Sequence, residues 1–248
     1  MDAIAGFSGL QIAVAAVATL GAAFIRGLTG FGFGILLVPI LALALTPVEA
    51  VLLLNMLAGL LALSEIRYVL REAERSALTI SALLVLTVLP GLLLLDALPP
   101  DLARLLIAIV ALSAFVAVLL PRREAHIPGP LATGFTGLSA GVLTGFAAMP
   151  GPPVVPYYVG RDIPRRTAKA SMIGIFGVAA LAGVSSGAVT GLLSWRLAIV
   201  GALLFPLVML GNWIGSLAFG KVSERVWRIF VGVVLGAAAL AALWKLVA

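Results

Sequence analysis

The sequence predicts an all-α, polytopic membrane protein. Hydrophobic residues make up 62% of the 248 residues and charged residues only 10%, whereas charged residues make up about 25% of soluble domains. The mean hydropathy is +1.22. Apolar runs of about the length that a helix needs to cross the hydrocarbon core follow one another along nearly the whole chain. No stretch is polar enough to fold as a separate domain in water.

We expect ten helical segments, because polar or proline-containing stretches divide the apolar sequence into ten runs. The sequence before the first run lacks the positive charge of a signal peptide, so this segment is expected to stay in the chain. The seventh run is short and rich in proline, and we expect it to be half helix and half extended chain. The ten segments span 8–25, 28–45, 47–64, 76–95, 102–120, 131–148, 150–160, 168–189, 197–219 and 226–247.

The Lys and Arg residues predict the sidedness of these segments. If all ten segments cross, the loops on one side hold 13 of the 16 basic residues, and the other side holds only Arg104, Arg196 and Lys245. Because cytoplasmic loops carry the excess of basic residues, this split places both termini outside the cytoplasm. If the second and seventh segments did not cross, the split would be much more even, so the ten-crossing topology is preferred.

The two halves of the chain also resemble each other. The stretch 27–47 (GLTGFGFGILLVPILALALTP) parallels 141–164 (GVLTGFAAMPGPPVVPYYVGRDIP). Five segments per half is an odd number, so the halves must be inverted relative to each other. We predict a first transmembrane repeat at 1–121, a second at 131–248 and a cytoplasmic connecting loop at 122–130. Inverted repeats with broken helices at matching positions, here segments 2 and 7, indicate the central site of a transporter.

These same residues resemble the sulfite exporter TauE/SafE family of bacterial and archaeal membrane proteins, over essentially the whole chain. Residues 30–34 read Gly-Phe-Gly-Phe-Gly where many members have Gly-Phe-Gly-Gly-Gly. Residues 150–153 read Pro-Gly-Pro-Pro where Gly-Gly-Pro-Pro is common, and 169–171 read Lys-Ala-Ser where Arg-Ala-Thr often follows. Members move small sulfur-containing anions such as sulfite and sulfonates, so the resemblance implies an anion transporter. Leu53 and Leu54 replace a common Thr-Ser pair, and Ala-Ala-Met at 147–149 replaces a glycine run, which leaves the particular anion open.

The glycines of segment 2 have two interpretations. Gly30 and Gly34 form a small-xxx-small pair that could pack two helices together. Alternatively, Gly30, Gly32 and Gly34 let the helix break and free backbone N–H groups at a helix start, which suits an anion. The matching break around 150–153 favours the second interpretation, because glycines that pack one helix pair need no counterpart there. The candidate substrate-binding residues are Thr29, Gly30, Phe31, Gly32, Gly34, Asn55, Thr144, Gly145, Phe146, Pro150, Gly151, Pro152, Lys169 and Ser171.

Some of these candidates have a structural alternative. The hydroxyls of Thr29 and Thr144 could instead bond to carbonyls of their own helices. The Asn55 amide, inside an apolar run, could contact the substrate or form an interhelical hydrogen bond. Lys169 could contact the substrate or extend to the cytoplasmic surface.

Other features are interpreted structurally. Tyr157 and Tyr158 are expected to be packing or interfacial residues, and Asn212 is a second lone amide in an apolar segment. The stretch 65–75 alternates charges at helical spacing. We expect it to extend the third segment as a cytoplasmic amphipathic helix held by ion pairs.

The leading functional hypothesis is a secondary transporter that exports a small oxyanion, such as sulfite or an organosulfonate, across the prokaryotic inner membrane. The expected partners are this anion and the lipid bilayer. The net charge of +6 arises from loops between apolar runs and indicates an anionic leaflet rather than nucleic acid. A homo-oligomer is left open.

Two other classes fit less well. An intramembrane enzyme needs a nucleophile with a base, or paired acids, at membrane depth, but the single histidine, His126, lies in a loop and cysteine is absent. The same composition predicts no metal and no other cofactor. The remaining alternatives are a structural subunit of a membrane complex and a cation- or proton-coupled carrier of another solute. A cation carrier should contain buried carboxylates, whereas all ten acidic residues fall in loops or at segment ends.

Overall fold

The computed structural model describes residues 6–29, 32–119, 128–159 and 161–217, together with 233, 240, 241, 243 and 244. Within these residues the chain is entirely helical and contains no strand. The helices are α1 (Gly9–Thr29), α2 (Phe33–Ala44), α3 (Pro47–Ser64), α4 (Ile66–Glu72), α5 (Arg75–Asp96), α6 (Pro100–Leu119), α7 (Pro130–Ala147), α8 (Gly151–Val159), α9 (Arg165–Val189) and α10 (Trp195–Leu217).

Five of the helices, namely α1, α3, α5, α9 and α10, are long and apolar enough to cross a membrane. By contrast, α2 has 12 residues and α8 has nine. At 1.5 Å per residue they are only about 18 Å and 14 Å long, short of the roughly 30 Å hydrocarbon core. The predicted polytopic all-α fold is confirmed, and segments 2 and 7 form the short helices α2 and α8.

The helix borders follow from local chemistry. The start of α3 is fixed by a capping box, in which the Thr46 hydroxyl accepts the Glu49 N–H and the Glu49 carboxylate accepts the Thr46 N–H. Pro47 occupies the first turn, where no N–H is needed. After Ser64 the chain continues through Glu65 into α4, which is the predicted extension of the third segment. The segment predicted at 226–247 lies largely outside the described residues.

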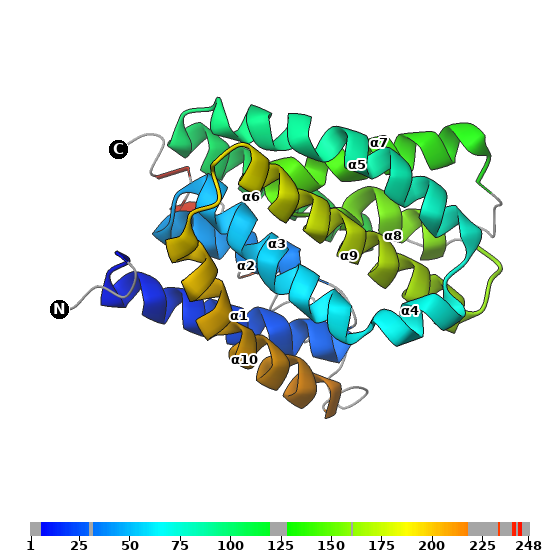
Figure 1. Cartoon of the computed structure of the whole chain (residues 1–248), viewed down its shortest axis with the longest axis horizontal. Helices are drawn as coiled ribbons and strands as arrows, with labels where there is room; N and C mark the ends of the chain where they lie inside the picture. Colours follow the sequence, from blue (N-terminus) through cyan, green and yellow to red (C-terminus); the bar gives the residue numbers. More distant parts are fainter. Residues whose placement is uncertain are drawn as a thin grey trace.

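The helices exchange partners between the two halves of the chain. Figure 1 shows α1 and α10 together along the lower edge of the bundle and α5 and α7 together along the upper edge, with α3 and α9 between them. Under the sequence repeat, α1 corresponds to α7 and α5 to α10. The first helix of the first half, α1, therefore packs on α10 of the second half. The first helix of the second half, α7, packs on α5 of the first half.

Corresponding helices run in opposite directions where they meet. Along the contact between α3 and α9, Leu52 lies against Gly187 and Ala62 lies against Gly177. The numbers rise on one helix as they fall on the other, so the two helices are antiparallel.

Glycines let the exchanged pairs approach closely. A Cβ atom on Gly145 of α7 would lie 2.0 Å from the Val88 carbonyl oxygen of α5. A Cβ atom on Gly215 of α10 would likewise lie 2.0 Å from the Phe24 carbonyl oxygen of α1. Neither position leaves room for a side chain.

We therefore expect Gly145→Ala to lower the melting temperature of the purified protein, because overpacking against backbone costs about 1–3 kcal/mol or more. Gly134→Ala in the same helix is the matched control, since a Cβ atom there meets nothing within 4 Å. Because alanine favours a helix over glycine by about 1 kcal/mol, the control should melt at the same or a higher temperature. Equal shifts in both variants, measured by scanning fluorimetry in detergent, would contradict this packing role.

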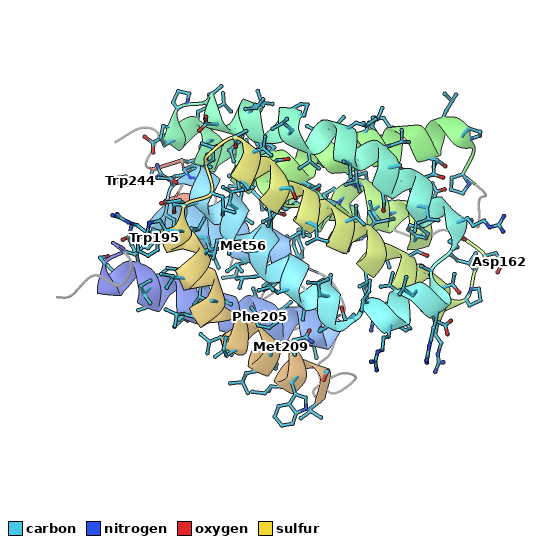
Figure 2. The ribbon with its side chains drawn as sticks, viewed as in Figure 1. Met56, Asp162, Trp195, Phe205, Met209 and Trp244 are labelled. Atoms are coloured by element: carbon cyan, nitrogen blue, oxygen red, sulfur yellow. The ribbon has the colours of Figure 1, made fainter. Side chains whose placement is uncertain are left out.

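The two ends of the bundle differ in side chains. Trp195 and Trp244 lie at one end and Asp162 at the other (Figure 2). The end with Asp162 also carries α4 and is called the α4 end below. Gly6 lies against the Arg196 side chain, so α1 and α10 both begin at the end opposite α4.

Candidate functional site

The first helix break separates α1 from α2. Gly32 adopts a left-handed conformation with φ of 91° and precedes the first residue of α2 without a side-chain cap. The first N–H to bond back toward the helix start is that of Leu36, which donates to the Gly32 carbonyl at 3.1 Å. The N–H groups of Phe33, Gly34 and Ile35 therefore have no acceptor within α2. The break leaves a set of N–H donors at a helix start.

The second break separates α7 from α8. Ala148 has φ of 51°, a left-handed conformation that is unusual for a residue with a side chain. Its N–H donates to the Thr144 carbonyl at 2.8 Å, and the Met149 N–H donates to the Leu143 carbonyl at 3.2 Å. These bonds terminate α7.

The short segment after this break differs from the prediction. All nine residues of Gly151–Val159 are helical, so the expected half-extended conformation is wrong. Pro152 and Pro153 fall in the first turn, where their missing N–H groups cost nothing. Only Pro156 lies deeper in the helix. The prolines thus initiate α8 rather than unwinding it.

The two breaks meet inside the bundle. A Cβ atom on Gly34 would lie 2.7 Å from the Ala148 carbonyl oxygen and 3.6 Å from Cγ of Met149. On its other side it would lie 3.1 Å from the Leu54 side chain of α3. The start of α2 is therefore in direct contact with the end of α7, and only glycine at position 34 permits it.

The surroundings of this contact are apolar. The side chains of Phe33, Leu54, Phe146 and Met149 are all buried. Backbone donors that face such an environment interact strongly with a negative charge, because little water competes with them. The N–H donors at the start of α2 are chemically suited to a small anion. A separate surface hollow between α1 and α2 is lined only by Ala13, Val14, Val17, Ala18 and Ile40 and has no polar group for a substrate.

The structure brings only part of the predicted site together. Gly32, Gly34, Phe146 and the start of α8, with Pro150, Gly151 and Pro152, belong to the two breaks. Gly30, Phe31 and the side chain of Thr29 lie outside the described residues.

Other predicted residues have structural contacts. The buried Thr144 hydroxyl donates to the Ala140 carbonyl of its own helix at 2.6 Å, and Gly145 packs α7 against α5. Asn55 is 2% exposed, and its amide nitrogen has no hydrogen-bond partner among the described residues. It lies against Gly183, where a Cβ atom would be 2.4 Å from that nitrogen.

Ser171 and Lys169 lie away from the breaks. The buried Ser171 hydroxyl accepts the Glu74 N–H at 3.0 Å, at the α4 end, and Lys169 is exposed. On α9, Ser171 precedes Gly183 by an axial distance of about 18 Å. Neither residue is brought to the contact between the breaks.

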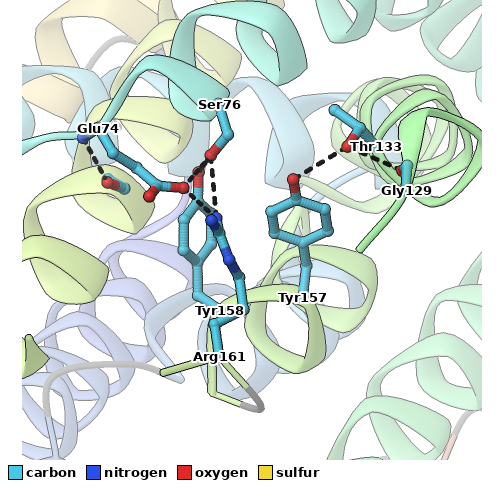
Figure 3. Close-up of polar contacts among 8 residues, drawn as sticks. Glu74, Ser76, Gly129, Thr133, Tyr157, Tyr158 and Arg161 are labelled. Carbon is cyan, nitrogen blue, oxygen red and sulfur yellow. Dashed lines mark hydrogen bonds and ion pairs between the residues drawn. The ribbon is translucent and has the colours of Figure 1, made fainter. Parts of the chain in front are cut away.

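The α4 end contains a polar group that sequence reasoning did not find, here called the Arg161 cluster and made up of Arg161, Glu74, Ser76, Tyr158 and Ser171 (Figure 3). Arg161 forms an ion pair with Glu74 and donates to the Ser76 hydroxyl at 3.3 Å. The Ser76 hydroxyl also bonds to Glu74 and lies 2.7 Å from the Tyr158 hydroxyl. The available signal in the sequence is the tyrosine pair at 157–158, for which the prediction is a packing or interfacial role.

A second ion pair connects the last turn of α1, just before the first break, with Glu65 at the α4 end. Arg26, three residues before the end of α1, donates to the Glu65 carboxylate at 2.7 Å and to the Asn212 side-chain oxygen at 2.8 Å. Asn212 is therefore a partner of Arg26 and not a lone amide. The predicted ion pairs within 65–75 are replaced, for Glu65 and Glu74, by pairs to residues far away in the sequence, Arg26 on α1 and Arg161 between α8 and α9. Among the described residues no three His, Cys, Asp or Glu side chains are grouped as a metal site would need.

Comparison with known proteins gives one match. The family model described as "Sulfite exporter TauE/SafE" matches residues 14–242. No curated protein and no solved structure matches the chain.

Proposed function

The chain belongs to the sulfite exporter TauE/SafE family, and from this premise we propose that it is a secondary transporter that exports a small oxyanion, such as sulfite or an organosulfonate. The family match covers most of the chain and implies a membrane exporter of this general type. The substrate, the direction of transport and the driving force are parts of the proposal.

The observation that carries the proposal is the contact between the two breaks. Gly34, at the start of α2, is pressed against Ala148, at the end of α7. Both α2 and α8 begin beside this contact. Helix starts attract anions through their free N–H groups and the helix dipole. An oxyanion bound there would accept hydrogen bonds from the first turn of α2. Asn55, whose amide nitrogen lacks a partner among the described residues, is a candidate for a further donor.

The test is a flux assay on purified protein in proteoliposomes, with labelled sulfite, sulfate, thiosulfate and methanesulfonate. We expect saturable flux of at least one sulfur oxyanion and none of sodium or potassium. Protein-free liposomes give the background. Flux of a cation in place of every anion would overturn the proposal.

We also propose that the two halves, 1–121 and 131–248, are inverted repeats joined by a cytoplasmic loop at 122–130, and that both termini face away from the cytoplasm of the prokaryotic inner membrane. The exchanged helix pairs and the antiparallel α3 and α9 support this proposal. The 13 basic residues assigned to one side support the same orientation.

Cysteine accessibility tests the sidedness on this cysteine-free chain. Ser8 and Asp162 are both exposed. Ser8 directly precedes α1, which begins at the end opposite α4, whereas Asp162 lies at the α4 end (Figure 2). In intact cells, we expect a membrane-impermeant maleimide to label Ser8→Cys and to spare Asp162→Cys until the membrane is permeabilised. The reverse pattern would overturn the proposed orientation.

A further inference from the structure

The Arg161 cluster has the composition of an anion-binding site. The Arg161 side chain is 16% exposed, and its guanidinium lies 5.4 Å from the ring centre of Tyr157 and 5.7 Å from that of Tyr158. The hydroxyls of Ser76 and Tyr158 lie on the same side of the cluster (Figure 3). A partly buried guanidinium with neighbouring hydroxyl donors is a common way to hold a carboxylate, sulfonate or sulfite group.

The occupant of this site in the structure is the carboxylate of Glu74. It pairs with Arg161 and accepts a hydrogen bond from Ser76. Among the described residues, the side-chain hydrogen bonds of Arg161 all use Nη1. Nε and Nη2 have no acceptor among the described residues. A planar guanidinium can hold two oxygens at once.

The location connects the cluster with the proposed transport site. Arg161 lies two residues beyond the end of α8, and the other end of α8 begins at the second break. The length of α8 sets the axial separation at about 14 Å. Glu74 lies in the short link between α4 and α5 with an extended backbone, and its N–H is held by Ser171 of α9. The cluster thus joins α8 to the link and to α9 at the α4 end.

Building on the proposed transport function, we propose that Arg161 forms a second oxyanion site at the α4 end, the entry to the transport route, and that the Glu74 carboxylate occupies this site until the anion displaces it. The anion then takes the acceptor role of Glu74 toward Arg161 and Ser76, and Glu74 moves toward solvent. The site accepts a small monoanion with two or more oxygens.

This proposal predicts opposite effects for the two partners of the ion pair. Glu74→Gln removes the competing charge, so the half-saturating sulfite concentration should fall about tenfold, a scale set by one charge-assisted hydrogen bond. Arg161→Gln removes the guanidinium that binds the anion, so the half-saturating sulfite concentration should rise about tenfold or more. Both values come from calorimetric titration of the purified protein with sulfite and from initial flux rates in proteoliposomes.

Opposite shifts of the half-saturating sulfite concentration distinguish an anion site from an ion pair that only holds the α4 end closed. If the ion pair only held the α4 end closed, either substitution would break it, and both variants would shift in the same direction. Under the proposed site, the double variant Glu74→Gln/Arg161→Gln should behave like Arg161→Gln alone. Shifts in one direction for both single variants, or no shift in either, would overturn the proposal.

A matched control exists at the same end. Glu65→Gln breaks the Arg26 ion pair without touching the Arg161 cluster, and Arg26 keeps its bond to Asn212. We expect its sulfite affinity to match that of the unmodified protein. Arg161→Lys keeps the charge and is expected to restore part of the affinity lost in Arg161→Gln.

The Arg161 site and anion transport can be tested independently of each other. If the unmodified protein binds sulfite with the predicted dependence on Glu74 and Arg161 but moves no anion, the site stands and the transport proposal fails. If anion flux is present but both substitutions leave its half-saturating concentration unchanged, transport stands and the Arg161 site fails.

Discussion

Replacing Gly34 by leucine is expected to abolish anion flux while the protein remains inserted in the membrane. A Cβ atom at this position would lie 2.7 Å from the Ala148 carbonyl oxygen, which is backbone and cannot rotate away. The remaining leucine atoms would have to enter the contact between the two breaks and would push the start of α2 away from α7. Initial flux in proteoliposomes measures the loss.

Gly21→Leu is the matched control, because Gly21 is exposed on α1 and a Cβ atom there meets nothing within 4 Å. It should transport at the unmodified rate. Gly34→Ala adds the smallest side chain and covers the case in which leucine prevents folding. If monodisperse Gly34→Ala or Gly34→Leu protein has the flux of the unmodified protein, Gly34 serves only helix packing. The two breaks would then not form the transport site.

Much of the fold could be predicted from the sequence because the bilayer imposes the length and apolarity of each helix. The segment predicted at 47–64 has the borders of α3, and the one predicted at 131–148 differs from α7 by one residue at each end. The break near Gly32 was also predictable, since a left-handed residue is most easily a glycine. The second break was less so, because Ala148 adopts its left-handed conformation without being glycine.

The tertiary contacts could not be predicted in the same way. The sequence repeat aligns the two breaks but contains no information that Gly34 touches Ala148. Charge alternation at 65–75 favoured local ion pairs, whereas Glu65 and Glu74 pair with Arg26 and Arg161, which are far away in the sequence. A short-range pattern cannot reveal a partner that only the folded bundle brings near. Ser171 follows the second break in the sequence and is therefore predicted to lie at the substrate site. In the folded bundle it lies at the α4 end, where its hydroxyl accepts the Glu74 N–H.

Anion export is expected to follow the membrane potential without an obligatory proton or sodium partner. The two acidic residues nearest to membrane depth in the sequence are held at helix ends, Glu49 in the capping box of α3 and Glu65 at its C-terminal cap, paired with Arg26. Neither is a free carboxylate in the middle of a span, where proton-coupled carriers keep a titratable group. The N–H groups at the start of α2 do not ionise in the physiological pH range, so they cannot carry a coupling proton.

The expected size of the effect follows from the charge moved. The potential contributes about 2.3 kcal/mol per charge per 100 mV, so about 150 mV gives a monoanion about 3.4 kcal/mol, or roughly 300-fold in concentration ratio. Methanesulfonate is the suitable probe because it keeps one negative charge over the whole working pH range. Its flux is measured in proteoliposomes whose voltage is set by potassium and valinomycin.

With the voltage fixed, imposing a pH or sodium gradient should leave methanesulfonate flux unchanged, whereas making the interior negative should drive the anion out against its own gradient. Glu49→Gln and Glu65→Gln should keep this voltage dependence, because each carboxylate stabilises a helix end and none exchanges a proton during transport. If flux instead ignores voltage and follows the pH gradient, and either substitution removes that dependence, then the substituted carboxylate carries the coupling proton. Transport would in that case be proton-coupled, and the helix-end contacts of Glu49 or Glu65 would have to open during each cycle.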